Sequence, residues 1–350
     1  MTIRVGMIGA GAIADDHCGN LQKHKEVELV AVADLSAERR ALVKKNYKMA
    51  RDYEKWEDLV NDAEIDAVVV ALPNVFHAPV ATAALNSGKH VLLDKPFAMN
   101  YAEAKKAVEA AKRKKKVLMV GMNQRYNVEA QSLRAIIDRK ELGEIYNVRT
   151  TWCRRAGSPK FGTWFVNKKL AGGGCMLDIG VHALDLTLYL MDNWEPVAVS
   201  GKTYGKFGHR GLGEGGWGKS DRDANTKFDV DDFATGFIKF KNEATVALAI
   251  SWIVHQENGN KFTIELCGTE AGGSYSPFKI FRPGKVAGEY EAVAPQNVQI
   301  PHKYQNRQIN WVDSILGADK PLCTMEQALV VQKILDAIYE SSETGKEVRL

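Results

Sequence analysis

The first fourteen residues, MTIRVGMIGAGAIA, constrain the fold of this chain more than any other segment. The apolar run Ile3–Ile8 leads into a glycine-rich turn, and helix-forming residues follow at once. This order is typical of a strand–turn–helix unit in which Gly9 allows a tight turn and Gly11 lets the backbone approach a pyrophosphate. The small Ala14 stands where the helix must pack against the strand. The predicted dinucleotide contacts in this turn are Gly9, Gly11, Ala12 and Ile13.

An acidic residue closes the next apolar run and bears on which dinucleotide is bound. Residues 29–33 are apolar and end at Asp34, about 20 positions beyond the glycine turn. A carboxylate there accepts hydrogen bonds from both hydroxyls of the adenosine ribose and repels a 2′-phosphate, so the sequence favours NAD. The nearby Arg39 leaves NADP open as the less favoured cofactor. The alternative interpretation is an ordinary strand–helix–strand unit with a glycine turn.

Length and composition exclude several classes of protein. A chain of 350 residues is too long for one compact core and predicts two domains. The net charge of +4 gives no reason to expect a nucleic acid or a membrane surface as partner. No apolar run approaches the ~18 residues that a membrane helix needs, and the first residues build a strand instead of a signal peptide. The five scattered cysteines predict reduced thiols in a cytoplasmic protein without a metal site.

Strand and helix patterns alternate through residues 1–122. Apolar strands are expected at 27–33, 66–71, 90–93 and 117–121, with helices at 36–46, at 76–86 and after Asn100. This alternation predicts a doubly wound parallel sheet of the Rossmann type with right-handed crossovers. Ligands bind such sheets at the carboxyl ends of the strands, where the glycine turn, Asp34, residues 72–74 and residues 94–96 all fall.

Residues 123–350 follow a different pattern. Helices are expected at 128–140, 175–191 and 325–340, and alternating β runs at 232–240, 245–253 and 262–266. Consecutive β runs joined by short polar turns predict an α+β domain on a large, mostly antiparallel open sheet with helices on one face. Whether the last helix packs back on the first domain is left open by the sequence.

Two irregular stretches have plain interpretations. Residues 201–227 contain eight glycines and mixed charge, which favours a surface loop over a lid or a subunit arm. The basic run 112–116 lies between a helix end and a strand and has no aromatic neighbours. It predicts a solvated helix terminus, where cations suit the helix dipole, and not a nucleic-acid site.

Two segments carry residues suited to chemistry. In the segment 172–185, Asp178 and His182 stand one helical turn apart, so the carboxylate can tune the imidazole as a general base. A structural Asp–His hydrogen bond at a buried helix start is the alternative. Lys95 ends a strand before the rigid Pro96, on the side of the sheet where the dinucleotide is expected. That position favours a functional amine over a surface lysine.

Four separated motifs occur in a fixed order: GAGAIADDH at 9–17, ALPNVFH at 71–77, GKHVLLDKP at 88–96 and GGGCMLDIGVHALDLTLYLM at 172–191. On these motifs the chain resembles the glucose–fructose oxidoreductase / inositol dehydrogenase / MocA-type (Gfo/Idh/MocA) family over essentially its whole length. The resemblance implies an NAD(P)-dependent oxidoreductase that acts on a secondary alcohol or ketone of a sugar, sugar derivative or cyclitol. It also implies a homodimer or homotetramer formed through the sheet of the second domain.

The resemblance assigns roles to three residues. The family's catalytic trio falls on Lys95, Asp178 and His182. His182 would take the proton of the substrate hydroxyl as hydride leaves the same carbon for nicotinamide C4. Lys95 would stabilise the charge on the reacting oxygen, and Asp178 would position a sugar hydroxyl and polarise His182.

Further site residues follow from the same resemblance. Pro73, Asn74 and His77 match a segment that lines the cofactor, and Arg125 and Tyr126 follow the last strand of the nucleotide domain, where relatives place cofactor and substrate contacts. Trp164 is a candidate for stacking on a sugar face, with core packing as an equally strong alternative. The family's Glu-Lys-Pro appears here as Asp94-Lys95-Pro96, which shortens a side chain expected near the cofactor ribose.

Two other functions remain open at this point. An NAD-dependent glycosidase would use the same hydride step transiently, acidify a neighbouring C–H and eliminate an aglycone. A sensor would bind NAD without turnover, and the intact set of Lys95, Asp178 and His182 counts against it. Net formation of NADH from a free sugar distinguishes the dehydrogenase from both.

Overall fold

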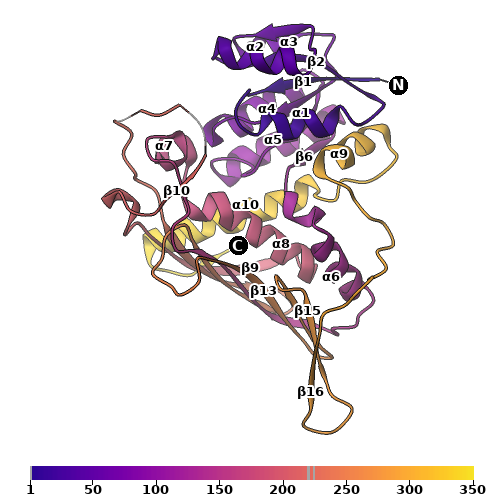
Figure 1. Ribbon diagram of the computed structural model, residues 1–350, viewed down its shortest axis with the longest axis vertical. Coiled ribbons are helices and arrows are strands. Elements are labelled where there is room, and N and C mark those ends of the chain that lie inside the picture. The colour runs from indigo at the N-terminus through magenta and orange to yellow at the C-terminus, as the bar shows by residue number, and fades with distance from the viewer. Residues whose placement is uncertain (1, 219–220, 224) are drawn as a thin grey trace.

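The computed structural model describes residues 2–218, 221–223 and 225–350 and contains two large sheets (Figure 1). Helices lie between the two sheets, and the sheet of the second half forms the lower part of the molecule in this view. Residues 219, 220 and 224, which belong to the predicted loop 201–227, lie outside the described residues.

The first sheet has six parallel strands in the order β3-β2-β1-β4-β5-β6. The order reverses between β1 and β4, and dinucleotides bind in the crevice at such a switch point. The predicted Rossmann fold is thus confirmed. The sequence patterns did not indicate β3 or α3 (Trp56–Asn61), which are only 3 and 6 residues long. The strands are β1 Ile3–Ile8, β2 Val27–Ala33, β3 Arg51–Tyr53, β4 Ala67–Val70, β5 His90–Leu93 and β6 Leu118–Val120.

Two helices of this half, Ala37–Asn46 and Tyr101–Lys114, begin at side-chain caps. The Ser36 hydroxyl accepts from the Arg39 amide at 3.3 Å, and the Asn100 side chain accepts from the Glu103 amide at 3.0 Å. Such caps satisfy backbone donors that have no partner inside the helix. The basic run 112–116 is the last turn of one helix and the residues after it, as predicted. The helices are α1 Ala14–Leu21, α2 Ala37–Asn46, α4 His77–Asn86 and α5 Tyr101–Lys114.

The second sheet has nine strands in the order β16-β15-β14-β13-β7-β12-β11-β9-β17. All its pairings are antiparallel except that between β7 and β12, so the predicted mostly antiparallel sheet is confirmed. The helices α6, α8 and α10 cover one face of it and separate it from the first sheet (Figure 1). The strands are β7 Ile145–Arg154, β9 Pro196–Tyr204, β11 Phe233–Phe240, β12 Thr245–Ser251, β13 Asn260–Gly268, β14 Gly272–Tyr275, β15 Lys279–Pro283, β16 Tyr290–Val293 and β17 Val348–Arg349, and the helices are α6 Val128–Asp138, α8 Val181–Met191 and α10 Met325–Thr344.

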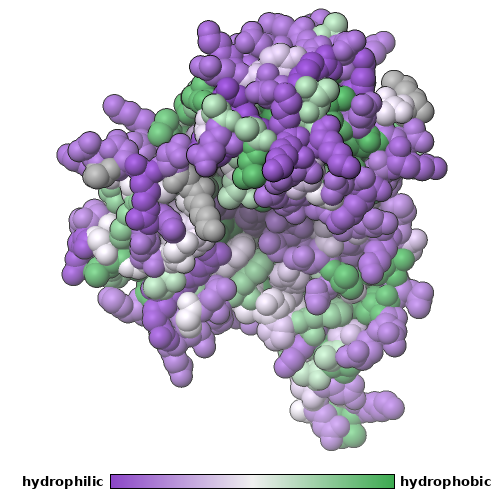
Figure 2. Space-filling model, turned by 45° about the horizontal axis from the view of Figure 1, so that its top comes forward, coloured by the Kyte–Doolittle hydropathy of each residue, from purple (hydrophilic) through white to green (hydrophobic). Residues whose placement is uncertain are grey.

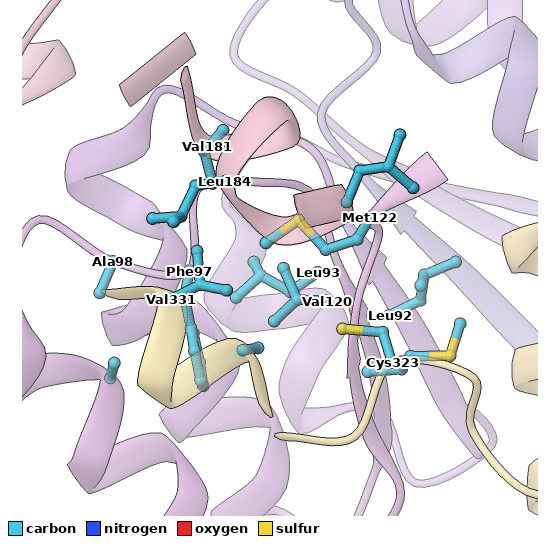
Figure 3. Packing of buried hydrophobic residues seen from close by; sticks show 14 of the residues in the cluster. Leu92, Leu93, Phe97, Ala98, Val120, Met122, Val181, Leu184, Cys323 and Val331 are labelled. Carbon is cyan, nitrogen blue, oxygen red and sulfur yellow. The ribbon is translucent and has the colours of Figure 1, made fainter. Parts of the chain in front are cut away.

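One buried cluster joins the two halves of the chain (Figure 3). Leu93 at the end of β5 and Phe97 just beyond it pack in the same cluster as Val181 and Leu184 of α8 and Val331 of α10. Burying large apolar side chains stabilises the fold by about 1.5–3 kcal/mol each. Because this cluster includes residues next to Lys95 and His182 in the chain, it fixes the Lys95 turn relative to α8. The helix α10 also contacts α5 and β6.

One helical stretch, Lys168–Met191, is long and apolar enough to cross a membrane by length and composition alone. It is not a continuous apolar run of the predicted kind, because Asp178, His182 and Asp185 interrupt it. Buried residues make up 89% of its apolar window, so its apolar character is explained by packing inside the protein. The stretch contains α7 (Lys168–Ala171), a π-helical turn (Met176–Gly180) and α8.

The described part of 201–227 is more ordered than a surface loop. The end of β9 occupies its beginning, and β10 (Glu214–Trp217) pairs in parallel with β8 (Ser158–Pro159). Asp221 forms an ion pair of 2.9 Å with Arg39 of the first sheet's α2. Most of these residues are exposed, which agrees with a surface segment, but 201–204 and 214–217 are strands and not loop.

Candidate active site

The glycine turn after β1 is tight at one position and open at another. Gly9 has φ +99°, and a Cβ there would stand 2.1 Å from the carbonyl oxygen of Ala71, so only glycine fits. A Cβ on Gly11 would meet no atom within 4 Å. Gly11, Ala12 and Ile13 are exposed. Open space beside exposed backbone at the start of α1 fits the pyrophosphate of a dinucleotide.

Asp34 lies beside this turn at the end of β2. Its Oδ2 accepts from the Ala10 amide at 2.8 Å, and its Oδ1 accepts from the Ser36 amide at 2.8 Å. Arg39 donates to the same Oδ1 through Nη2 at 3.0 Å. The geometry thus places a carboxylate and a guanidinium together where the adenosine end of a dinucleotide is expected. Their roles toward a cofactor stay predictions.

Lys95, Asp178 and His182 meet in one pocket of about 560 Å³. Lys95 Nζ donates to Asp178 Oδ1 at 2.7 Å and to the Asp178 carbonyl oxygen at 2.9 Å. Trp252 Nε1 donates to Asp178 Oδ2 at 2.9 Å. Figure 2 shows the surface hollowed between the upper and lower parts of the molecule. An ammonium has three N–H donors, so one donor of Lys95 remains for a ligand in the pocket.

His182 is not bonded to Asp178, whose carboxylate is taken by Lys95 and Trp252. Its Nδ1 is buried and has no hydrogen-bond partner among the described residues. Burial lowers the pKa of His182 well below its usual value, and the cations of Lys95 and Arg307 lower it further. The imidazole is therefore neutral and able to accept a proton. The predicted direct polarisation of His182 by Asp178 does not occur in this geometry.

Asp231 fixes the start of the helix that bears Asp178 and His182. Its carboxylate accepts from the amides of Gly174 at 2.7 Å and Met176 at 3.0 Å, and from the Tyr339 hydroxyl at 2.8 Å. A Cβ on Gly174 would lie 1.9 Å from the Asp231 carbonyl oxygen, which explains the glycine run before the helix. The first turn is a π-helix, Met176–Gly180, a form often found at functional sites.

Asp94, which replaces the family's glutamate, is engaged inside the protein. Its Oδ1 lies 3.1 Å from Nε2 of the fully buried His17 and 3.9 Å from Nη2 of Arg307 in α9 (Arg307–Leu316). Burial opposes ionisation of Asp94, yet His17 and Arg307 lower its pKa below the usual value. The shorter side chain therefore ties the turn that carries Lys95 to α1 and α9.

Arg125 and Tyr126 do not line the pocket, so their prediction as substrate contacts is wrong. Arg125 is fully buried and donates to the two Asp185 oxygens at 2.9 and 2.6 Å and to the Leu322 carbonyl at 2.7 Å. The Tyr126 hydroxyl donates to Asn310 Oδ1 at 2.9 Å. Both side chains form their hydrogen bonds with groups inside the protein, because burying a polar group costs free energy unless it is paired.

Asn74, His77 and Trp164 have partners inside the protein. Asn74 Nδ2 donates to the Ala171 carbonyl at 2.8 Å, and the His77 ring nitrogens lie 2.6 and 2.7 Å from the carbonyls of Pro96 and Leu72. Both residues are buried and tie the loops after β4 and β5 to neighbouring segments, and their contact with a cofactor stays a prediction. The ring of Trp164 stacks on that of Phe165 with the ring centres 3.8 Å apart, and Trp164 does not line the pocket. Pro73 precedes a short 3₁₀ turn.

The pocket includes residues that the sequence did not single out. The main ones are Trp152 and Arg154 at the end of β7 and Trp217 of β10. Trp152 and Arg154 are two positions apart on a strand, which puts them on the same face. An aromatic residue and an arginine at the carboxyl end of a strand were the available indication, although nothing local links them to Asp178.

The comparisons with known proteins decide the family. A family model described as an oxidoreductase family with an NAD-binding Rossmann fold matches residues 3–122, and the GFO/IDH/MocA C-terminal domain matches 130–273. A putative UDP-kanosamine synthase oxidoreductase subunit of Amycolatopsis mediterranei (strain S699) is 33% identical over 73% of this chain and 70% of its own. The chain belongs to the Gfo/Idh/MocA oxidoreductase family.

Two other comparisons extend over nearly the whole chain. A D-glucoside 3-dehydrogenase of Escherichia coli (strain K12) is 28% identical over 99% of this chain and 97% of its own. A solved levoglucosan dehydrogenase, in complex with NADH and levoglucosan, has a TM-score of 0.82 at 22% identity, covers 100% of this chain and 99% of its own, and shows the shared fold. The predicted family and its NAD-binding Rossmann domain are thus confirmed.

Proposed function

We propose that this protein oxidises a secondary alcohol of a sugar, sugar derivative or cyclitol with NAD, or reduces the matching ketone. The observation that carries the proposal is the 2.7 Å contact of Lys95 Nζ with Asp178 in the same pocket as the neutral His182. A hydrogen-bond donor and a proton acceptor facing one cavity are what removal of a hydride from an alcohol carbon requires. The sugar and cyclitol dehydrogenases among the relatives support the substrate class.

The glycine turn and Asp34 would hold the cofactor. NAD, when bound, supplies a nicotinamide that accepts the hydride. The open space at Gly11 suits the pyrophosphate, and the Asp34 carboxylate suits the hydroxyls of the adenosine ribose. A 2′-phosphate would meet the negative charge of Asp34, which favours NAD, although Arg39 lies within bonding distance of that carboxylate.

His182 and Lys95 have different roles at the alcohol oxygen of the substrate. The neutral imidazole of His182 takes the hydroxyl proton, and the third N–H of Lys95 donates to the same oxygen as negative charge develops there. Asp178 holds Lys95 in place, and Trp252 holds Asp178. In this arrangement Asp178 acts through Lys95 instead of through His182.

A substrate panel tests the proposal. The purified protein is mixed with NAD or NADP and a series of sugars, glycosides and cyclitols, and absorbance of the reduced nicotinamide is followed. We expect net NADH from at least one of them, faster with NAD than with NADP. Release of an aglycone without net NADH would assign the glycosidase reaction instead. Binding of NAD without turnover of any compound would assign a sensor.

We also propose a homo-oligomer in the cytoplasm. The five cysteines are free thiols, which suits a reducing compartment. Phe237 of β11 is 40% exposed on a sheet where its neighbours Ile238 and Ala234 are fully buried, so an apolar side chain stands on the face away from the core. Light scattering on the eluting protein measures the mass, and a monomer at micromolar concentration would contradict the proposal.

A further inference from the structure

Arg154 lines the pocket and uses only one of its guanidinium nitrogens in a hydrogen bond among the described residues. It ends β7, and its Nη1 donates to the Gly157 carbonyl at 3.2 Å. The structure gives Nε and Nη2 no partner, and no carboxylate pairs with Arg154 in the described part of the chain. The same Gly157 carbonyl accepts from Trp217 Nε1 at 2.8 Å. The guanidinium carbon lies 5.3 Å from the ring centre of Trp152 and 5.8 Å from that of Trp217, so two aromatic rings hold it.

Two other arginines show what this edge binds when it is occupied. Arg125 uses Nε and Nη2 to grip both oxygens of Asp185 at 2.9 and 2.6 Å. Arg4 grips both oxygens of Asp66 with the same two nitrogens at 3.0 and 2.9 Å. The side-on fork of an arginine matches a planar carboxylate in this way. Arg154 lines the pocket with the same two nitrogens, Nε and Nη2, unpartnered among the described residues.

The charges of the pocket do not balance. Its described lining carries two cations, Lys95 and Arg154, and one carboxylate, Asp178. Lys95 and Asp178 neutralise each other at 2.7 Å, and His182 is neutral. Burial lowers the pKa of Arg154, while the Asp178 charge opposes that shift. A partly buried cation without a fixed partner favours a ligand that brings a negative charge.

We propose that Arg154 binds a carboxylate of the substrate, so that the preferred substrate is a sugar acid, such as a uronate, oxidised at a ring hydroxyl. The inference rests on the proposed dehydrogenase function and narrows its substrate class. A pocket of about 560 Å³ has room for a monosaccharide. One arginine matches a single negative charge, whereas a phosphate dianion commonly takes several cations or a helix N-terminus. The geometry therefore favours a carboxylate over a phosphate.

Matched substrates test this assignment. The rate of NADH formation is measured with D-glucuronate, its neutral amide, D-glucose and D-glucose 6-phosphate, and with the galactose equivalents. We expect the highest kcat/KM with a uronate, about 10–100-fold above its neutral amide, mainly through a lower KM. In Arg154→Gln the preference for the uronate over the amide falls about 10–100-fold, to near one, and Arg154→Lys restores part of it because lysine keeps the charge but lacks the planar pair of N–H donors. Arg113→Gln, an exposed change in α5, serves as the matched control and leaves the preference intact.

Several outcomes overturn the assignment. A neutral sugar or a sugar phosphate turned over better than every uronate would do so, as would an equal loss on uronate and amide in Arg154→Gln. A thermal unfolding curve on each variant distinguishes loss of the contact from loss of folding. If Arg154→Gln does not fold, the uronate preference of Arg154→Lys is compared with that of the unchanged protein. Absence of NADH formation from every compound, charged or neutral, would instead remove the proposed dehydrogenase function.

Discussion

Two ion pairs on one helical stretch differ in burial, and this difference separates a pair suited to catalysis from a pair that stabilises the fold. Lys95 after β5 pairs with Asp178, and Arg125 after β6 pairs with Asp185. In both, a cation that follows a strand of the parallel sheet reaches a carboxylate within 176–191. The side chains of the first pair are 21% and 11% exposed, and those of the second are 0% and 1% exposed.

The fully buried Arg125–Asp185 pair, called the sealed pair below, bonds only to groups inside the protein. Burial opposes the charge of Arg125, yet the Asp185 carboxylate raises its pKa above the ordinary value. The Leu322 carbonyl and the Gln327 side chain take further donors of Arg125 at 2.7 and 2.6 Å. The Lys95 pair, in contrast, keeps a donor for a ligand and stands at an open cavity. The same kind of interaction thus fixes the fold at one end of the stretch and is available for catalysis at the other.

The largest effect is expected from breaking the sealed pair. Asp185→Asn leaves the Arg125 charge buried without a counter-charge, which lowers the free energy of unfolding by about 3–5 kcal/mol. Urea denaturation followed by tryptophan fluorescence measures the loss. The double variant Asp185→Asn with Arg125→Met removes both charges and should recover most of the stability. A loss below about 1 kcal/mol in the single variant would show that the pair is not sealed.

Breaking the Lys95–Asp178 pair, the open pair, should lower the reaction rate more than the stability. Lys95→Met removes the donor to the reacting oxygen, and kcat falls by about 10²–10³-fold. The free energy of unfolding changes by about 1 kcal/mol or less, because Asp178 keeps its bond from Trp252 and contact with the pocket. Stopped-flow formation of NADH and urea denaturation give the two numbers. A variant that unfolds easily but retains its rate would reverse the contrast between the two pairs.

The sequence indicated both residues of the Lys95–Asp178 pair, although not their contact with each other, and it gave no sign of the Arg125–Asp185 pair. Lys95, Asp178 and His182 lie in local motifs, next to a strand end, a glycine run and a proline, each of which has its own physical cause. Arg125 and Asp185 are 60 positions apart, and nothing near either residue indicates the other. A position after a strand of a parallel sheet suits ligand binding as well as an internal ion pair, so only the packing of α8 decides between them.

The same reasoning explains which elements were predicted. The apolar runs Leu29–Ala33 and Val91–Leu93 indicated β2 and β5, because the part of a strand that is buried on both faces needs apolar residues. Glu214–Trp217 has the sequence EGGW, which carries no strand pattern, and it pairs only because β8 lies beside it. Trp217 therefore reached the pocket through a tertiary contact that no local pattern encodes.

The reaction at the Lys95–Asp178 end of the stretch should lose rate only at acid pH, below the ordinary pKa of a histidine. Oxidation needs the neutral imidazole of His182, and burial lowers the pKa of that residue below its ordinary 6.5. The kcat/KM for oxidation therefore stays level as the pH falls through 6.5, and declines about tenfold per pH unit only below the lowered pKa. Initial rates between pH 5 and 9 at constant ionic strength measure this limb. A midpoint at 6.5 or above would mean that the site leaves His182 hydrated, and unfolding curves at each pH exclude loss of fold.

The smallest effect is expected from a third pair that also links the two halves of the chain. Lys112 of α5 lies 2.9 Å from Glu326 of α10, but the two side chains are 56% and 54% exposed. Water and salt screen such a pair, so Lys112→Gln should lower the free energy of unfolding by about 0–1 kcal/mol, and less at 1 M salt. A double-mutant cycle with Glu326→Gln measures the coupling, and kcat should not change. The N···O distance differs little from that of the Lys95 or Arg125 pair, so a coupling near 3 kcal/mol would show that separation, and not burial, sets the strength of these contacts.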